Sequence, residues 1–152
     1  MYKFLKSALT RFISQGDSPV TQDETDSIKF AVTILLVEVM YADHKLDKLE
    51  KKVVIKLLQE QFALDAAEAI RLFDLASHKM NDVVSLHQYT SRVNTELTIQ
   101  EKHSLMINLW KVVFADGQVD KYEEHFVRRV ADLLHYSHRD FIKAKHVAAE
   151  ML

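Results

Sequence analysis

The amino-acid sequence predicts an all-α protein, first because of its composition. Only two glycines and one proline occur in 152 residues, so the chain lacks the residues that tight hairpins and β-bends need. Hydrophobic residues make up 48% of the sequence, which is enough for a sizeable core in a single domain of this length. The second observation is that apolar residues recur at helical spacing along most of the chain. We therefore predict one domain of about eight helices that contains internally duplicated helical hairpins.

Charge and cysteine content exclude several functional classes. Twenty Lys and Arg residues against 22 Asp and Glu residues give a formal net charge of -2. This balance lacks the basic excess that binding to a phosphate backbone requires, so we expect no nucleic-acid partner. The chain has no cysteine, which excludes disulfides and thiolate metal sites and suits a cytoplasmic protein.

The first predicted element is an amphipathic helix over residues 2–14. Its apolar stripe consists of Leu5, Ala8, Leu9, Phe12 and Ile13. Its polar side is basic and carries Lys3, Lys6 and Arg11. We expect this helix to dock on its own domain, to exchange into a second copy and form a homodimer, or to contact an anionic membrane surface. Docking or dimerisation is preferred, because three basic residues at roughly 1 kcal/mol each give only marginal membrane binding.

The predicted organisation is a helix, a linker and a helical domain. Residues 1–15 form the helix, and residues 16–21 form the linker because they hold half of the glycines and the only proline. Residues 22–152 form the domain. Helices inside it begin at capping boxes, in which an N-cap side chain and an acid three residues later cap each other's backbone N–H. The candidate pairs are Thr21/Glu24, Asp47/Glu50, Asp65/Glu68, Thr98/Glu101, Asp120/Glu123 and Ser137/Asp140.

Two predicted helices, over residues 28–42 and 105–115, are apolar on nearly all sides, so both should lie at the centre of the domain. They occupy equivalent places in a repeat, because YADHKLDKLE at residues 41–50 aligns with FADGQVDKYE at residues 114–123. Each copy contains a central helix, an acidic turn, an amphipathic helix and an outer helix. The copies span about residues 28–76 and 101–148, and a helix over residues 82–96 joins them. The predicted core includes Leu36, Val39, Val53, Leu57, Leu109, Trp110, Val113, Phe126 and Val130.

The acidic turns carry the main candidate site. Each contains the pattern Ala-Asp-x-x-(Leu/Val)-Asp-x-x-Glu. The acidic residues are Asp43, Asp47 and Glu50 in the first turn and Asp116, Asp120 and Glu123 in the second. The second Asp and the Glu are explained as N-cap and N3 residues of the following helix. The first Asp of each turn is not explained by capping, because it lies at a helix C-terminus, where the helix dipole disfavours a carboxylate.

A divalent cation held by oxygen ligands would explain this misplaced carboxylate, and so would a Lys or Arg from a neighbouring helix. Plain helix capping without a cation is the preferred interpretation. If a cation binds, we expect the second turn to bind it first, because Gly117 allows a positive φ that His44 disfavours in the first turn. The other candidate is Glu38, which interrupts an apolar helix. We expect Arg128 or Arg129 to pair with it, which is a simpler explanation than catalysis.

No catalytic or cofactor-binding residue can be assigned, because the sequence has no Gly-rich phosphate loop, nucleophile elbow or triad pattern. The duplicated turn, the stretch over residues 108–134 and SHRDFI at residues 137–142 resemble the tellurite resistance protein B-like (TerB-like) family, in particular its stand-alone bacterial members. The resemblance covers about residues 25–148, and the family's acidic positions carry over to the six acidic residues named above. His44 replaces the usual turn glycine, which argues against equal metal binding by the two turns.

The resemblance implies an all-α fold with an internal repeat and a cytoplasmic or membrane-peripheral location. It also implies a non-enzymatic interaction module that serves tellurite, metal or general stress response through an unidentified protein partner. The alternative is a metal-dependent small-molecule enzyme or a metal-ion sensor that uses the acidic turns.

Overall fold

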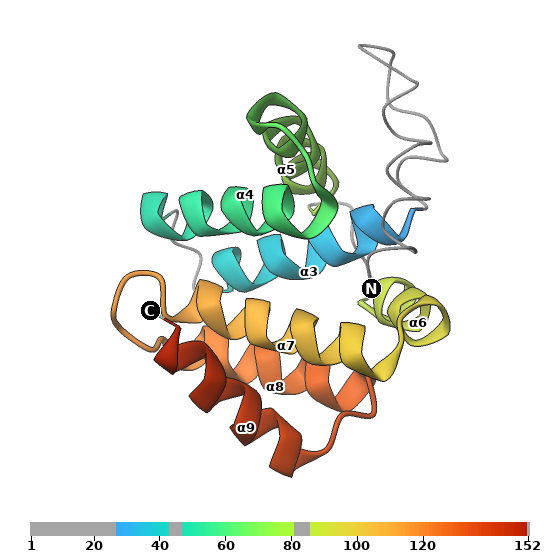
Figure 1. The fold of residues 1–152 in the computed structure, drawn as a ribbon, viewed down its shortest axis with the longest axis vertical. Helices are drawn as coiled ribbons and strands as arrows, with labels where there is room; N and C mark the ends of the chain where they lie inside the picture. Colours follow the sequence, from blue (N-terminus) through green and yellow to red (C-terminus); the bar gives the residue numbers. More distant parts are fainter. Residues whose placement is uncertain (1–26, 43–46, 81–85, 152) are drawn as a thin grey trace.

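The computed structural model describes residues 27–42, 47–80 and 86–151, and all helices and contacts below lie within these ranges (Figure 1). This part of the chain is helical and contains no strand, which confirms the predicted all-α fold. The helices are α3 (Ile28–Tyr41), α4 (Lys48–Phe62), α5 (Ala66–Met80), α6 (His87–Glu96), α7 (Ile99–Val113), α8 (Lys121–Leu133) and α9 (His138–Glu150). The helix predicted over residues 2–14, the linker and the pair Thr21/Glu24 lie outside the described residues.

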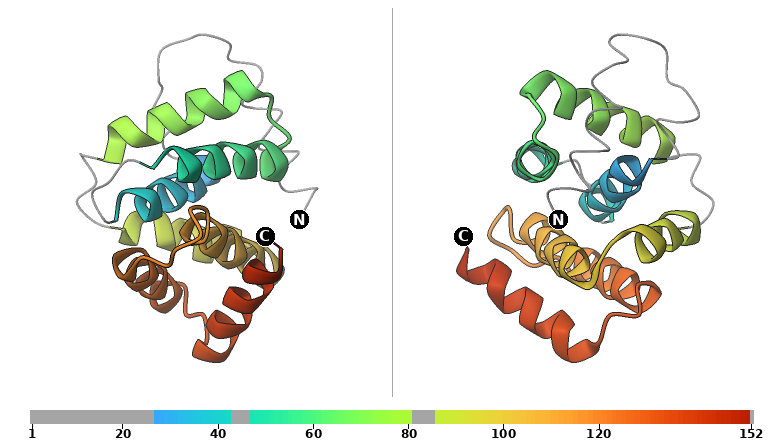
Figure 2. Two further views of the ribbon diagram at one scale, coloured as in Figure 1. Left: turned by 90° about the vertical axis from the view of Figure 1, so that its left-hand side faces the viewer. Right: turned by 45° about the vertical axis from the view of Figure 1, so that its right-hand side comes forward.

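Helices α3 and α7 lie at the centre of the molecule, as their apolar sequences predict (Figures 1 and 2). Helices α4 and α5 pack on α3, whereas α8 and α9 pack on α7. The two halves also pack across each other, because α4 contacts α7 and α8 contacts α3. This reciprocal packing is what two copies of one three-helix unit produce when they meet through their central helices. Helix α6 joins the copies and contacts α3 and α8.

The buried core follows the predicted pattern closely. Every residue of the predicted core is buried except Val53 and Phe126, which are partly buried and pack against it. Along the joining segment, Leu86, Tyr89, Val93 and Leu97 are buried; α6 begins at His87, and residues 82–85 of the predicted helix lie outside the described residues. Met151, which follows α9, is 58% exposed.

Side-chain caps start most of the helices where the sequence predicts them. Thr98 and Glu101 form a reciprocal capping box at α7, and Asp65 and Glu68 cap each other's backbone at α5. Ser137 accepts from the backbone N–H of Asp140 at 3.1 Å. The cap of α3 was missed: Ser27 accepts from the N–H of Phe30 at 3.1 Å, and no acid at that position marks the helix start.

Two helices end in the left-handed conformation without glycine. Ala63 (φ 54°) follows α4 and His135 (φ 56°) follows α8. Glycine is the usual residue at such positions, but the chain has only two. Among the described residues, no helix has the length and apolar character needed to cross a bilayer.

Candidate metal centre

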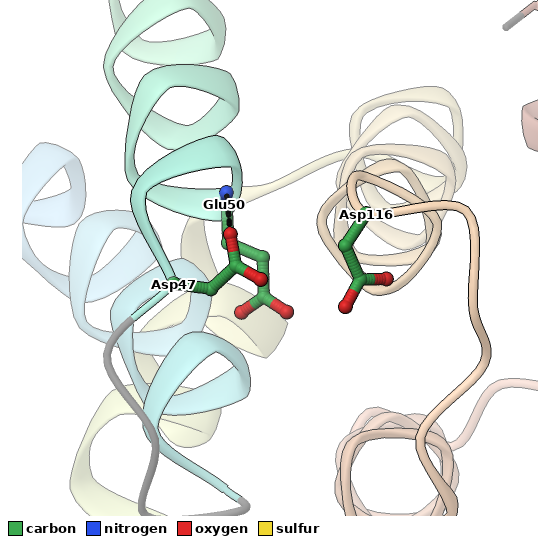
Figure 3. A group of neighbouring side chains, drawn as sticks. All are labelled: Asp47, Glu50 and Asp116. Carbon is green, nitrogen blue, oxygen red and sulfur yellow. Dashed lines mark hydrogen bonds between the residues drawn. The ribbon is translucent and has the colours of Figure 1, made fainter.

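The candidate site begins at the N-terminus of α4. Asp47 is the N-cap, and its Oδ1 accepts from the backbone N–H of Leu49 at 2.7 Å and of Glu50 at 3.2 Å. These bonds leave the rest of its carboxylate facing away from the helix (Figure 3). Glu50 is the N3 residue, and it is 2% exposed. The N-terminal end of the helix dipole stabilises both negative charges.

Asp116 brings a third carboxylate from the turn after α7. Its Oδ1 accepts from the backbone N–H of Gln118 at 3.0 Å. Gly117, at φ 80°, reverses the chain there, and its N–H donates to the carbonyl of Phe114 at 3.0 Å. The turn therefore fixes Asp116 at the end of α7, where it faces the start of α4 (Figure 3).

One carboxylate oxygen from each of Asp47, Glu50 and Asp116 lies within 4.8 Å of the other two. Contact between α4 and α7 produces this arrangement, so the cluster draws on both copies of the repeat. The repeat in the sequence instead groups the acids turn by turn and places Asp116 with Asp120 and Glu123. Within the described residues, those two acids are not part of the cluster.

Asp120 and Glu123 have capping positions at α8 that correspond to those of Asp47 and Glu50 at α4. Oδ1 of Asp120 accepts from the N–H groups of Tyr122 at 2.8 Å and Glu123 at 3.2 Å. Glu123 is 1% exposed, like its counterpart Glu50. The remaining residues of the first turn that the sequence singled out, Asp43 and His44, lie outside the described residues.

The cluster concentrates negative charge, because three carboxylates at this separation repel one another. The end of α7 adds the negative pole of its helix dipole beside Asp116. Asp116 forms no ion pair within the described part of the chain, so the Lys or Arg considered as its partner is not found there. A bound cation would offset the repulsion from all three acids at once.

The spacing of the oxygens fits calcium. Calcium binds oxygen at about 2.3–2.6 Å, so two of its ligands can be up to about 5 Å apart. The three oxygens, all within 4.8 Å of one another, satisfy this condition. Magnesium binds oxygen at about 2.0–2.1 Å, so its ligands lie at most about 4.2 Å apart, and calcium accepts the wider range of separations. Three carboxylates would fill part of a calcium shell, and water or backbone carbonyls would supply the other ligands.

Glu38 lies apart from this cluster and is half-buried in α3. Burial raises the pKa of its carboxyl, and the positive charge of Arg129 opposes that rise. Arg128, the other predicted partner, pairs with Glu124 at 3.6 Å. Of the two arginines, Arg129 is therefore the one whose charge acts on Glu38.

The left-handed conformation of Gly117 predicts that a residue with a Cβ at this position destabilises the protein. We expect Gly117→Ala to lower the free energy of unfolding by about 1 kcal/mol, because a Cβ disfavours this backbone conformation. Apart from Gly117 itself and its two chain neighbours, no atom of the described residues lies within 4 Å of the added Cβ, so the cost comes from the backbone and not from a clash. Chemical denaturation measures it. Gly117→Asn should cost less, since Asn tolerates positive φ, and equal costs for Ala and Asn would contradict the explanation.

Comparison with known proteins places the chain in a family. It matches the family described as tellurite resistance protein TerB over residues 29–146. No curated protein and no solved structure matches it. The matched segment runs from the first turn of α3 into α9 and so includes both copies of the repeat and all three acids of the cluster. With most of its length matched, the chain belongs to the TerB family.

Proposed function

We propose that this chain is a non-enzymatic, cytoplasmic interaction module of the TerB type, in which a calcium ion binds between Asp47, Glu50 and Asp116. The observation that carries the proposal is the convergence of three carboxylate groups, one of them buried, from two copies of the repeat. The chain's own residues would hold the ion through carboxylate oxygens. The ion would supply positive charge and link the start of α4 to the end of α7.

Apolar side chains beside the site support an interaction role. Leu49, two residues after Asp47, is 52% exposed, and Val119, three residues after Asp116, is 43% exposed. Tyr122, at the repeat position of Leu49, is 56% exposed. A protein partner could bury these side chains on turns whose geometry the cation fixes.

The enzyme alternative requires a concave pocket in which polar groups converge. One hollow lined by described residues, with a volume of about 650 Å³, lies on α5. Its lining contains neither Glu38 nor an acid of either turn. This hollow therefore offers no site for a hydrolase that uses the acidic turns.

Calorimetric titration of the chelator-treated chain with calcium tests the proposal. Asp47→Asn and Asp120→Asn form a matched pair, because each Asp is an N-cap whose Oδ1 accepts from two backbone N–H groups. Asn caps helices as well as Asp does, so neither substitution should disturb its helix. We expect Asp47→Asn to weaken calcium binding at least tenfold. Asp120→Asn should leave one ion bound with unchanged affinity.

Asp116→Asn gives an independent readout through stability. We expect calcium at about 100 times its Kd to stabilise the wild-type chain by about 2.7 kcal/mol and thus to raise its Tm by several degrees. In Asp116→Asn that rise should be lost. In chelator the variant should be at least as stable as the wild type, since it relieves repulsion and Asn can still accept from Gln118.

Two outcomes would contradict the proposal. Loss of binding in Asp120→Asn but not in Asp47→Asn would place the ion in the second turn alone. The absence of heat and of any thermal shift with calcium, magnesium, manganese and zinc would leave both turns as helix caps. Partner capture with and without calcium then tests whether the module's binding depends on the ion.

A further inference from the structure

The outer side of α5 is the second surface of interest. Helix α5 lies at the edge of the molecule, with α3 and α4 on its inner side (Figure 2). Its inner side buries Ala69, Leu72, Phe73 and Ala76. The hollow of about 650 Å³ lies on the other side and is lined by Ala67, Ile70, Arg71, Asp74, Leu75 and His78.

This lining has the spacing of a helix-binding face. The residues recur at intervals of three and four, so they form one stripe along α5. From residue 67 to residue 78 the stripe is about 17 Å long at the helical rise of 1.5 Å per residue. Ile70 lies within it and is 42% exposed. A surface helix usually presents polar residues on the side away from the core, so the exposed Ile70 on this side is available to a second packing partner.

The start of α3 shows where the preceding chain arrives. Helix α3, whose N-cap is Ser27, packs directly on α5. The chain before Ser27 is therefore joined to a helix that contacts α5. Residues 15–26 can span up to about 40 Å when extended, which exceeds the length of the whole stripe.

The segment before this connection has matching chemistry. Residues 2–14 would form a helix about 20 Å long, and its apolar stripe needs cover. Residues 1–16 contain Lys3, Lys6 and Arg11 but no acidic residue. The outer side of α5 carries the exposed Asp74, whose charge can pair with one of these bases. Arg71 and His78 are the basic groups of the same face.

We infer that residues 2–14 dock as an amphipathic helix in the hollow on α5 of the same chain. Leu5, Leu9 and Phe12 lie along its apolar stripe and are the side chains that would cover Ile70 and Leu75. Docking within one chain is favoured over exchange into a second copy, because α3 contacts α5 and residues 15–26 are long enough to reach along the whole stripe. The acidic cluster takes no part in this contact, so this inference does not depend on cation binding.

Disulfide trapping in the full chain tests the contact, because the natural chain has no cysteine. The test pair is Leu9→Cys with Ile70→Cys. The control pair is Leu9→Cys with Val119→Cys, since Val119 is 43% exposed and Ile70 is 42% exposed. We expect the test pair to form an intramolecular bond at least about tenfold faster than the control, because docking raises the local thiol concentration. Intact mass and electrophoresis without reductant distinguish the products.

A double-mutant cycle gives a second readout. Ile70→Asp should lower the Tm of the full chain, whereas in a chain that lacks residues 1–16 the same change should have almost no effect. Val119→Asp should show no such dependence on residues 1–16.

Three results would overturn the inference. Equal bond formation in the test and control pairs would mean that the segment has no preferred position. A covalent dimer from the test pair would show exchange between copies. Slow bond formation together with binding to anionic vesicles that requires residues 1–16 would show that a membrane covers the apolar stripe.

Discussion

Replacing Trp110 by Ala should lower the free energy of unfolding by about 3–5 kcal/mol, the largest loss that we expect from a single substitution. Trp110 is fully buried in α7 and packs against α9, where its ring centroid lies 5.1 Å from that of Phe141. It also stacks on Phe114, with 5.7 Å between centroids, and Lys145 Nζ lies 5.2 Å from the centre of its ring. Ala would leave a cavity where α7 and α9 meet and remove all three contacts.

Trp110→Phe is the matched control. Within the described residues, the buried indole Nε1 has no hydrogen-bond partner, so Phe removes an unsatisfied donor while it keeps an aromatic ring. We expect a loss of about 1 kcal/mol or less. Urea denaturation followed by circular dichroism measures both variants, because Trp110 is the only tryptophan and its removal eliminates the natural fluorescence signal. A small loss for Ala, or equal losses for Ala and Phe, would contradict the assigned role of the ring.

Raising the pH from 7.5 to 9.5 should increase the contribution of Lys29 to the free energy of unfolding by about 2 kcal/mol. Lys29 is 1% exposed, and burial lowers the pKa of its ammonium group to about 8, although the Glu68 carboxylate opposes the shift. In the unfolded chain the group keeps its usual value near 10.5. Between these two values the unfolded state binds more protons than the folded state, so stability rises with pH.

Lys29→Met isolates this contribution, because Met fills a similar volume without a titratable group. We expect the stability of the variant to lack this increase over the same interval. Denaturation at several pH values up to 9.5 measures the difference. Higher pH brings an opposing effect, since burial raises the pKa of Tyr136 to about 12 and its folded state then holds the extra proton. Parallel curves for the wild type and Lys29→Met would contradict the lowered pKa.

The helices could be predicted because their signals are local. Residues 28–42 and 105–115 are apolar on nearly all sides, and only a central position can bury such helices, which is where α3 and α7 lie. Paired caps such as Thr98 and Glu101 locate a helix start from four residues alone. The start of α3 could not be predicted from a capping box, because the residue three positions after Ser27 is Phe30 and not an acid. The ends of α4 and α8 could not be predicted, because Ala63 and His135, and not glycines, adopt the left-handed conformation there.

The membership of the acidic cluster could not be predicted in the same way, because it depends on tertiary packing. The repeat showed that Asp116 and Asp43 are equivalent, as are Glu123 and Glu50. It did not show that the end of α7 faces the start of α4. The contact between α4 and α7 brings Asp116 to Asp47 and Glu50. The signal that could have shown this is the dipole argument, because a carboxylate at a helix C-terminus requires a partner outside its own turn.

Paramagnetic broadening by manganese tests the cation site most directly, since Mn²⁺ also prefers oxygen ligands and broadens only nearby signals. In an amide spectrum of the full chain, substoichiometric Mn²⁺ should broaden Leu49 and Glu50 at the start of α4 together with Gly117 and Gln118 after α7. Excess Ca²⁺ should restore these signals. The capped start of α7 around Glu101, a buried N3 acid outside the cluster, should stay sharp. Broadening confined to residues 116–124, or spread evenly over all exposed acids, would contradict a cation site between the two copies.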